Sequence, residues 1–442
     1  MYAVSLSYGR ETSFLRIRIF TMQTIVIGGG AAGMMAAVAC ADAGDSVILL
    51  EKNEKLGKKV FITGKGRCNV TNACDRDAFF SHVVSNPKFL YSAYSQFDNE
   101  ALMEFIEANG TALKVERGNR VFPVSDHSYD IIDAFKRALS KRKVDVRLHC
   151  EVKDILTEEY IDPEDKKAHS KIIKGVKLSS GEILSAEKVI VATGGVSYPS
   201  TGSTGDGYDF ASKTGHKLVA SKPALVPFTT KEEWVTQLQG LTLKNVKLSL
   251  YINDKCVYSE QGELLFTHFG ISGPLALTAS SYYAKADEIK SAYVYLDLKP
   301  ALSSDEFDKR LIREFENGNR KEFKNILGEL YPQKLASLVC DITGLDPYKR
   351  CNEISGSERK TLLKFTKEMK ITITGTRDFN EAIITHGGVS VKDINPKTME
   401  SKLVKNLYFA GEVIDLDAHT GGFNLQIAFS TGYLAGKSGY ES

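Results

Sequence analysis

The chain has 442 residues, which corresponds to about three domains at roughly 150 residues per domain. Apolar residues make up 43% and charged residues 25%, an ordinary globular composition that excludes disordered, collagen-like and coiled-coil classes for most of the chain. The formal net charge is +2, so the charge balance gives no reason to expect nucleic acid or an anionic membrane as the main partner.

The seven cysteines follow no pattern of a metal site or of a disulfide framework. The sequence has no C-x-x-C pair and no cysteine–histidine cluster with zinc spacing, so we expect no metal. Unclustered cysteines in odd number are typical of a reducing compartment. Because the sequence also has no apolar run of about 18 residues to span a bilayer, we expect a cytoplasmic protein without a membrane partner.

The first 21 residues carry scattered charges and differ in character from the rest of the chain. They lack the continuous apolar core and the small-residue cleavage site of a signal peptide. The first strong strand pattern begins directly after Met22, so we expect residues 1–21 to be an extension upstream of the natural start. The alternative is a short ordered strand from Phe14 to Phe20.

A strand, a glycine-rich turn, a helix and a second strand come next. Thr24–Ile27 is a short apolar and β-branched run, which predicts a buried strand. Gly28–Gly33 forms the turn, an alanine-rich helix follows, and Ser46–Leu50 is the second strand, which meets Glu51. This order predicts a βαβ unit of a parallel sheet and an α/β fold class.

Helix and strand patterns alternate up to residue 192. Helices are predicted at 87–97, 100–109 and 130–141, and strands at 144–148, 151–156, 172–178 and 183–184. The apolar run Lys188–Ala192 predicts another buried strand, which enters Thr193-Gly194-Gly195.

The pattern changes after residue 198. Residues 198–207 form a loop, and the alternating stretches 241–252 and 292–298 predict antiparallel strands of a small barrel or sandwich. Helical spacing begins at 303, with Ser304 as the expected N-cap, and continues to 370. Strands are predicted again at 371–374 and 407–410, and a closing helix at 426–435.

The turn Gly28-x-Gly30-x-x-Gly33 has the full context of a dinucleotide-binding motif. Gly28 permits the tight turn, Gly30 allows backbone to approach a diphosphate, and Gly33 allows close packing of helix and strand. The helix N-terminus offers free N–H groups to the phosphates. Glu51, at the end of the next strand, can accept hydrogen bonds from ribose hydroxyls and would repel a 2′-phosphate.

The motif alone does not decide between NAD and FAD. Two late strands, at 188–192 and 407–410, end in Thr193-Gly194-Gly195 and Gly411-Glu412. Strands that return to the sheet in this way can reach the ribityl chain and the flavin ring, which a simple NAD domain does not need. We therefore expect FAD as the cofactor.

Other candidates lie in loops. In the Gly64–Asn69 loop, Arg67 and Asn69 can bind phosphate or flavin, and Cys68 is either a redox thiol or a packed small residue. The helix that opens at Gly421-Gly422 can stabilise negative charge on reduced flavin. Three residues beside glycine or proline are candidate proton donors near the flavin: His386, His268 and Tyr198. For each of them the alternative is a purely structural role.

These motifs together resemble the BaiN-like (YhiN-like) flavoproteins, a family of NAD(P)/FAD-dependent oxidoreductases that includes flavin-dependent aminoacetone oxidase. The similar stretches are 27–33, 63–69, 192–207, 262–274, 395–402, 409–412 and 421–426. They occur in order from near Met22 almost to the end of the chain, so the resemblance covers nearly the whole sequence.

The resemblance implies a Rossmann-like FAD-binding domain of glutathione-reductase type at 22–198 and 386–442. It implies an inserted β-barrel domain at 199–302 and 370–385, with a small helical insert at 303–369 between the two barrel parts. It also implies FAD contacts at Gly28, Gly30, Ala32, Gly33, Glu51, Lys52, Arg67, Cys68, Asn69, Val152, Thr193, Gly194, Gly195, Gly411, Glu412, Gly422, Asn424, Leu425 and Gln426.

We expect an enzyme that takes hydride from NAD(P)H and reduces an activated, unsaturated small organic molecule. The sequence has no second G-x-G-x-x-G, so the nicotinamide nucleotide must enter the same site as the substrate, in ping-pong order. One alternative is an amine oxidase that passes electrons to O₂. Another is a flavin-dependent RNA-modifying protein or a flavin-binding scaffold, against which the near-neutral charge counts. The oligomeric state stays open.

Overall fold

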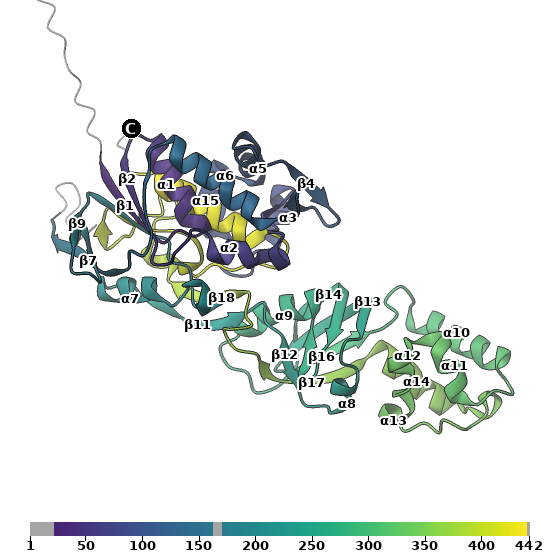
Figure 1. Cartoon of the computed structure of the whole chain (residues 1–442). Coiled ribbons are helices and arrows are strands. Elements are labelled where there is room, and N and C mark those ends of the chain that lie inside the picture. The colour runs from purple at the N-terminus through teal and green to yellow at the C-terminus, as the bar shows by residue number, and fades with distance from the viewer. Residues whose placement is uncertain (1–21, 162–169, 440–442) are drawn as a thin grey trace, which may run out of the picture.

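The computed structural model describes residues 22–161 and 170–439. Three bodies follow one another along the molecule: an α/β body with both described ends of the chain, a β-barrel, and a helical body at the far end (Figure 1). The expected extension 1–21 and its alternative strand 14–20 lie outside the described residues.

A parallel sheet of five strands forms the centre of the α/β body. Its order is β20-β10-β1-β2-β6, and every neighbouring pair is parallel. The strands are β1 (Gln23–Ile27), β2 (Ser46–Leu50), β6 (Asp145–Arg147), β10 (Lys188–Val191) and β20 (Leu407–Phe409). Buried apolar runs such as β10 are typical of parallel strands with both faces covered. The predicted α/β fold class is confirmed.

Two long helices, α1 (Ala31–Asp42) and α15 (Phe423–Lys437), pack against each other beside this sheet (Figure 1). Glycines allow the close approach, because a Cβ at Gly432 would lie 2.3 Å from the Ala32 carbonyl oxygen and one at Gly436 2.5 Å from that of Ala36. The other helices of this body are α2 (Lys58–Ile62), α3 (Arg76–Ser81), α4 (Tyr91–Gln96), α5 (Asn99–Ala108), α6 (Ser128–Lys141) and α7 (Asp206–Lys213).

Two smaller sheets complete the α/β body. One has the order β3-β5-β4, with β3 (Thr71–Asn72), β4 (Leu113–Glu116) and β5 (Arg120–Pro123). The other has the order β19-β8-β7 with β9 paired to β8, and its strands are β7 (Val152–Glu159), β8 (Lys171–Leu178), β9 (Ile183–Ser185) and β19 (Val404–Lys405).

A closed barrel of six strands forms the second body. Its order is β12-β15-β14-β13-β16-β17. The strands are β12 (Phe228–Thr230), β13 (Thr242–Ile252), β14 (Lys255–Phe266), β15 (Gly270–Ser272), β16 (Ala292–Asp297) and β17 (Met369–Thr376). Asn253 and Asp254 both have positive φ, as a two-residue hairpin between β13 and β14 requires. The helix α9 (Gly273–Lys285) packs against β14.

The barrel strands begin at Phe228, later than the expected boundary at 199. The intervening residues form α7 and the strand β11 (Leu218–Ala224), which pairs antiparallel with β18 (Ile384–Val389) outside the barrel. The pattern of alternation did not reveal this pair, because β18 is buried along its whole length. In Figure 1 the β11–β18 pair lies between the α/β body and the barrel.

The helical body contains α10 (Ser304–Asn317), α11 (Phe323–Leu330), α12 (Gln333–Ala336), α13 (Val339–Thr343) and α14 (Gly356–Lys367). Its first N-cap is Ser303, one residue before the expected Ser304, and Ser303 forms a capping box with Glu306. The apolar side chains of the barrel and the helical body belong to one core, whereas the α/β body has a separate core.

In the described part of the chain, no helix is long and apolar enough to cross a membrane. Within residues 22–161 and 170–439, no group of three or more histidine, cysteine, aspartate or glutamate side chains is arranged to hold a metal ion.

Candidate functional site

A cavity of about 1130 Å³ lies where strands of the parallel sheet end. Residues that follow β1, β2, β10 and β20 line it, namely Gly28, Glu51, Thr193 and Glu412. Ligands of open parallel α/β sheets bind at this edge of the sheet. The cavity is therefore the candidate functional site.

The glycine turn forms one wall of the cavity. Gly28 has φ +102°, and a Cβ there would lie 2.6 Å from the carbonyl oxygen of Ala192 on the neighbouring strand. A Cβ at Gly33 would lie 1.8 Å from the Gly28 carbonyl oxygen, so both positions require glycine for backbone packing. Gly30 has open space instead and is the N-cap of α1 without a side-chain cap, which leaves N–H groups of α1 available to a phosphate.

The Glu51 carboxylate is held in place at the end of β2, with only 8% of the residue exposed. Oε2 accepts a hydrogen bond from Gly29 N (2.7 Å), and Oε1 accepts from the backbone N (2.8 Å) and Nδ2 (2.6 Å) of Asn53. These bonds fix a negative, acceptor-only group beside the glycine turn. Such a group suits the hydroxyls of an adenosine ribose.

Two buried polar atoms of the cavity wall have no hydrogen-bond partner among the described residues. They are Oγ1 of Thr193 and Oδ1 of Asn69. A buried polar atom without a partner is costly, and in a cavity wall it indicates a polar ligand. Together with the glycine turn and Glu51, these atoms fit an FAD molecule.

A second helix N-terminus meets the cavity at α15. Its N-cap is Gly422, with φ +99° and no side-chain cap. Asn424 fixes the preceding loop: its Oδ1 accepts from Ala418 N, and its Nδ2 donates to the carbonyl oxygens of Ala418 (2.9 Å) and His419 (3.1 Å). The free N–H groups of this helix end can face a developing negative charge.

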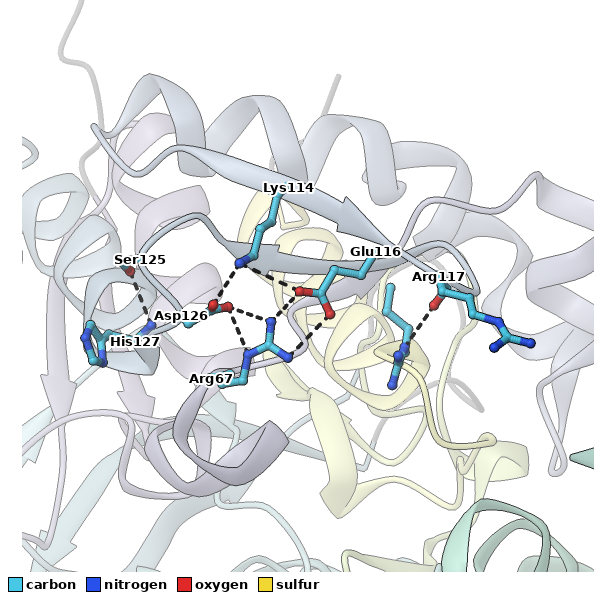
Figure 2. A network of polar contacts seen from close by, with 8 residues as sticks. Arg67, Lys114, Glu116, Arg117, Ser125, Asp126 and His127 are labelled. Atoms are coloured by element: carbon cyan, nitrogen blue, oxygen red, sulfur yellow. Dashed lines mark hydrogen bonds and ion pairs between the residues drawn. The ribbon is translucent and has the colours of Figure 1, made fainter. Parts of the chain in front are cut away.

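Arg67 lies at the cavity wall, but its guanidinium is already neutralised (Figure 2). It forms ion pairs with Glu116 and with Asp126 and lies 4.2 Å over the Phe122 ring. Hydrogen bonds from Lys114 and Arg67 hold the pKa of the Asp126 carboxyl below its usual value, and Arg67 does the same for Glu116. Arg67 thus joins its loop to β4 and to the segment after β5.

Most of the residues expected to contact FAD line this cavity. Those that do are Gly28, Gly30, Ala32, Glu51, Lys52, Arg67, Asn69, Val152, Thr193, Gly194, Glu412, Gly422, Asn424 and Leu425. Those that do not are Gly33, Cys68, Gly195, Gly411 and Gln426.

The expected FAD contacts that do not line the cavity are packed against, or hydrogen-bonded to, other parts of the protein. Gln426 is fully buried: its Oε1 accepts from Thr71 Oγ1 (2.6 Å), and its Nε2 donates to the Phe97 carbonyl and to Ser430. Gly195 is packed against Thr385, and Gly411 against Ala32. The side-chain amide of Gln426 is thus occupied by partners within the protein.

Cys68 is not a reactive thiol in this structure. The residue is fully buried, has φ +57° and does not line the cavity. Burial raises the pKa of its thiol to about 12, so the nucleophilic thiolate is not formed at neutral pH. Of the two possibilities, a redox thiol or a packed small residue, the structure therefore favours a packed residue at Cys68.

His386 and Tyr198, the other catalytic candidates, do not line the cavity either. His386 is buried on β18, where its Nδ1 lies 3.1 Å from Oδ1 of the fully buried Asp417. Tyr198 has φ +50°, and its backbone N donates to the Phe379 carbonyl. Sequence position alone could not show that these two residues are not part of the lining.

A cluster that the sequence did not single out holds Glu412 at the cavity. The Lys59 Nζ lies 2.6 Å from Oε2 of Glu412 and donates to Ser197 Oγ at the same distance. Oε1 of Glu412 accepts from Ser197 Oγ (2.9 Å) and from Thr385 N (2.8 Å). The lysine-rich stretch after Glu51 was the available signal, but its partners are about 140 to 350 residues away in sequence.

His419 is a second cavity residue that sequence reasoning missed. Its Nε2 lies 2.9 Å from the hydroxyl of Tyr282 on α9, across the boundary between the α/β body and the barrel. Burial lowers the pKa of His419 to about 4, and His82 adds to this effect while Asp417 opposes it. In the sequence, His419 is an isolated histidine two residues before a glycine pair, and no known motif there indicates a cavity residue.

The part of the wall nearest the barrel is mostly apolar, although Glu263 of β14 and Ser272 of β15 also line it. Its apolar side chains come from the barrel, from α9 and from the segments that join the bodies: Leu225, Leu265, Pro274, Leu277, Ile383 and Ile384. One cavity thus joins the polar glycine turn to an apolar wall.

The chain is similar to known proteins over most of its length. The family model described as HI0933-like protein Rossmann domain matches residues 22–438. A 3-dehydro-bile acid delta(4,6)-reductase of Clostridium scindens is 30% identical, covering 94% of this chain and 98% of its own length. A ribosomal RNA dihydrouridine synthase of Haemophilus influenzae is 31% identical, covering 94% and 98%. The solved 3-ketosteroid delta1-dehydrogenase of Sterolibacterium denitrificans is 14% identical with a TM-score of 0.48, covering 94% and 98%.

The match over nearly the whole chain decides the family, and it agrees with the resemblance found in the sequence motifs. The chain belongs to the HI0933-like (BaiN/YhiN) family of FAD-dependent oxidoreductases.

Proposed function

We propose that the protein is a reductase that uses FAD to transfer hydride from NAD(P)H to a carbon–carbon double bond conjugated to a carbonyl group. The observation that carries the proposal is the single cavity, in which a dinucleotide-type turn and an apolar wall face the same space. Bound FAD would supply a carrier that accepts hydride from one molecule and delivers it to another.

The residues of the chain would hold the cofactor along the floor of the cavity. The N-terminus of α1 and the open face of Gly30 would bind the diphosphate, and Glu51 the ribose. Thr193 and Asn69 would satisfy their unpaired oxygens on the cofactor. The N-terminus of α15 would face the negative charge that develops on the reduced ring.

The substrate would lie between the cofactor and the barrel. Leu265, Pro274 and Leu277 give this region an apolar surface that suits a hydrocarbon ring or another flat, weakly polar molecule. The nicotinamide nucleotide would occupy the same space before the substrate, because the sequence has no second dinucleotide motif. Two relatives bear names of reductions that saturate a double bond, which supports this reaction class.

Anaerobic rapid mixing tests the proposal. The FAD-loaded protein is mixed with NADH or NADPH, and the loss of the flavin absorbance is followed; an unsaturated ketone such as 2-cyclohexen-1-one is then added. We expect bleaching by at least one nucleotide and recovery of the absorbance with the ketone. Bleaching by a small amine but by neither nucleotide would replace the proposal with an amine oxidase, which hydrogen peroxide formation in air would identify.

A second candidate substrate is a uracil ring in ribosomal RNA. The observation that favours it is the similarity of 94% of this chain to a ribosomal RNA dihydrouridine synthase. The uracil ring also contains a double bond conjugated to a carbonyl, so the chemistry in the cavity would be the same. Loss of dihydrouridine from ribosomal RNA in cells that lack the gene would support this substrate, and unchanged dihydrouridine would exclude it.

A further inference from the structure

His419 lies at the point where the α/β body meets the barrel. It belongs to the loop before α15 and lines the cavity, and Asn424 binds its carbonyl oxygen. Its partner Tyr282 comes from α9 of the barrel body. The hydrogen bond between them therefore joins the part that would hold FAD to the part that would hold the substrate.

The hydrogen bond determines which ring nitrogen of His419 is available. Among the described residues, the Tyr282 hydroxyl has His419 Nε2 as its hydrogen-bond partner and no other. Burial raises the pKa of Tyr282, so the phenol keeps its proton. Because this O–H has no other acceptor among the described residues, it donates to Nε2. In a neutral imidazole the proton then sits on Nδ1, which has no partner within the described ranges.

The groups around His419 keep its ring neutral. His82, the C-cap of α3, has its ring centroid 5.1 Å from that of His419. Asp417 lies two positions before His419 in the loop that precedes α15. On the barrel side, Tyr258 of β14 packs beside Tyr282 and donates to Glu260. Burial outweighs the nearby Asp417 and keeps the imidazole pKa near 4, so the ring is uncharged at neutral pH.

His82 cannot take the same role, although it also lines the cavity. Its Nδ1 lies 2.6 Å from the Ala78 carbonyl oxygen and donates to it, which leaves an acceptor at Nε2. Its ring stacks on Phe423 at a centroid distance of 4.5 Å, which fixes its plane. His419 is thus the histidine with a free N–H.

We propose that His419 binds the carbonyl oxygen of the substrate, donating a hydrogen bond from Nδ1 as a neutral imidazole whose tautomer Tyr282 fixes. This inference rests on the proposed function. When hydride derived from NAD(P)H adds to the β-carbon, the electron pair of the double bond moves toward the carbonyl, and the oxygen gains the negative charge. The Nδ1–H stabilises that charge. The α-carbon then takes a proton from water, so the product has gained one hydride and one proton.

In this scheme His419 is a catalytic residue and Tyr282 is a positioning residue. The neighbouring Tyr283 provides a matched control, because its hydroxyl has no hydrogen-bond partner among the described residues and its ring packs against Phe228. A Tyr283→Phe variant removes the same atom from the same helix without changing the tautomer of His419.

Nitrogen NMR of the ¹⁵N-histidine-labelled, FAD-bound protein tests the tautomer without turnover. The His419 signals are the ones lost in His419→Phe, and we expect the proton on Nδ1. Tyr282→Phe should move it toward Nε2, the tautomer that a free histidine prefers, and Tyr283→Phe should not. A proton on Nε2 in the wild type, or no change in Tyr282→Phe, would overturn the proposal.

The second measurement separates the two half-reactions. The enzyme is reduced with dithionite, and its reoxidation by 2-cyclohexen-1-one is followed. We expect reoxidation to be about 100-fold slower in His419→Phe, with partial rescue in His419→Gln, which keeps an N–H donor. Tyr282→Phe should be intermediate. In each of these variants, reoxidation by the ketone should slow far more than flavin reduction by the preferred nicotinamide.

The outcomes distinguish the inference from the function on which it rests. If the wild-type reduced enzyme is reoxidised by the ketone and His419→Phe is equally fast, the role of His419 is wrong while the proposed function stands. If the wild type is not reoxidised at all, the proposed function fails and the carbonyl-binding role fails with it. In that case the NMR result still decides whether Tyr282 sets the tautomer.

Discussion

Gly30 and Gly33 stand three residues apart in the same turn, but their surroundings differ. A Cβ at Gly33 would overlap the Gly28 carbonyl oxygen at 1.8 Å, whereas a Cβ at Gly30 would meet no atom within 4 Å. Gly33 therefore serves the packing of α1 on β1. Gly30 leaves a surface on which a diphosphate can approach the backbone.

This contrast predicts different results for the same substitution. Gly33→Ala should lower the free energy of unfolding by roughly 1–3 kcal/mol, the usual cost of overpacking, and should weaken FAD binding as a consequence. Gly30→Ala should change the stability of the FAD-free protein by less than about 1 kcal/mol, because a poorer N-cap and a lower entropy of the unfolded chain oppose each other. It should still lower FAD affinity by about tenfold, or ~1.4 kcal/mol. Calorimetry of both apoproteins and FAD titration provide the measurements. Full FAD affinity in Gly30→Ala would contradict the assigned path of the diphosphate.

At the scale of elements, α1 and α15 depend on glycines for their contact. A Cβ at Gly436 would lie 2.5 Å from the Ala36 carbonyl oxygen and 2.6 Å from the Ala39 Cβ. Gly328 in α11 is also a helical glycine, but a Cβ there would meet open space. The two positions make a matched pair for one substitution.

Gly436→Ala should destabilise the protein by roughly 1–3 kcal/mol, because the helices must separate. Gly328→Ala should stabilise α11 by about 0.5–1 kcal/mol, because alanine has the higher helix propensity. Chemical denaturation of both variants checks the opposite signs. Equal effects of the two substitutions would show that the close approach of α15 to α1 is not as described.

At the scale of the whole molecule, the described residues form two large hydrophobic cores. One belongs to the α/β body, and the other is shared by the barrel and the helical body. A small third cluster consists of Ala224, Leu225, Ala284 and Ile384. The cavity lies between the first core and the barrel, and the cofactor contacts proposed above all come from the α/β body. Ligand binding should therefore stabilise the two cores unequally.

Differential scanning calorimetry should show two unfolding transitions. FAD at 100 times its Kd should stabilise the transition of the α/β body by about 2.7 kcal/mol and leave the other nearly unchanged. Gly328→Ala marks the second transition, because Gly328 lies in the helical body. One transition that moves as a unit with FAD would contradict two independent cores.

Sequence reasoning reached the parts of the site whose signals are local. Gly28, Gly30 and Glu51 follow one another within a single βαβ unit, and strand ends mark Thr193 and Glu412. It did not reach the pairing of Tyr282 with His419, because these residues come from different bodies and are 137 positions apart.

The sequence could not show the surroundings of the Gly64–Asn69 loop. Glu116 and Asp126, the partners of Arg67, are 49 and 59 positions away, and the choice between a redox thiol and a packed residue at Cys68 depends on its burial. The barrel strands begin at Phe228, and the stretch before them contains β11, which pairs with β18 outside the barrel, a pairing that local patterns do not indicate.

The central claim is that FAD binds along the glycine turn, with its diphosphate at α1 and its ribose at Glu51. The most direct measurement is a titration of the FAD-free protein with FAD and, in parallel, with FMN, followed by flavin fluorescence. FMN carries the same ring but lacks the adenosine half, so the account predicts tight binding of one FAD per chain and much weaker binding of FMN. Failure to bind FAD, or equal affinity for both flavins, would contradict it.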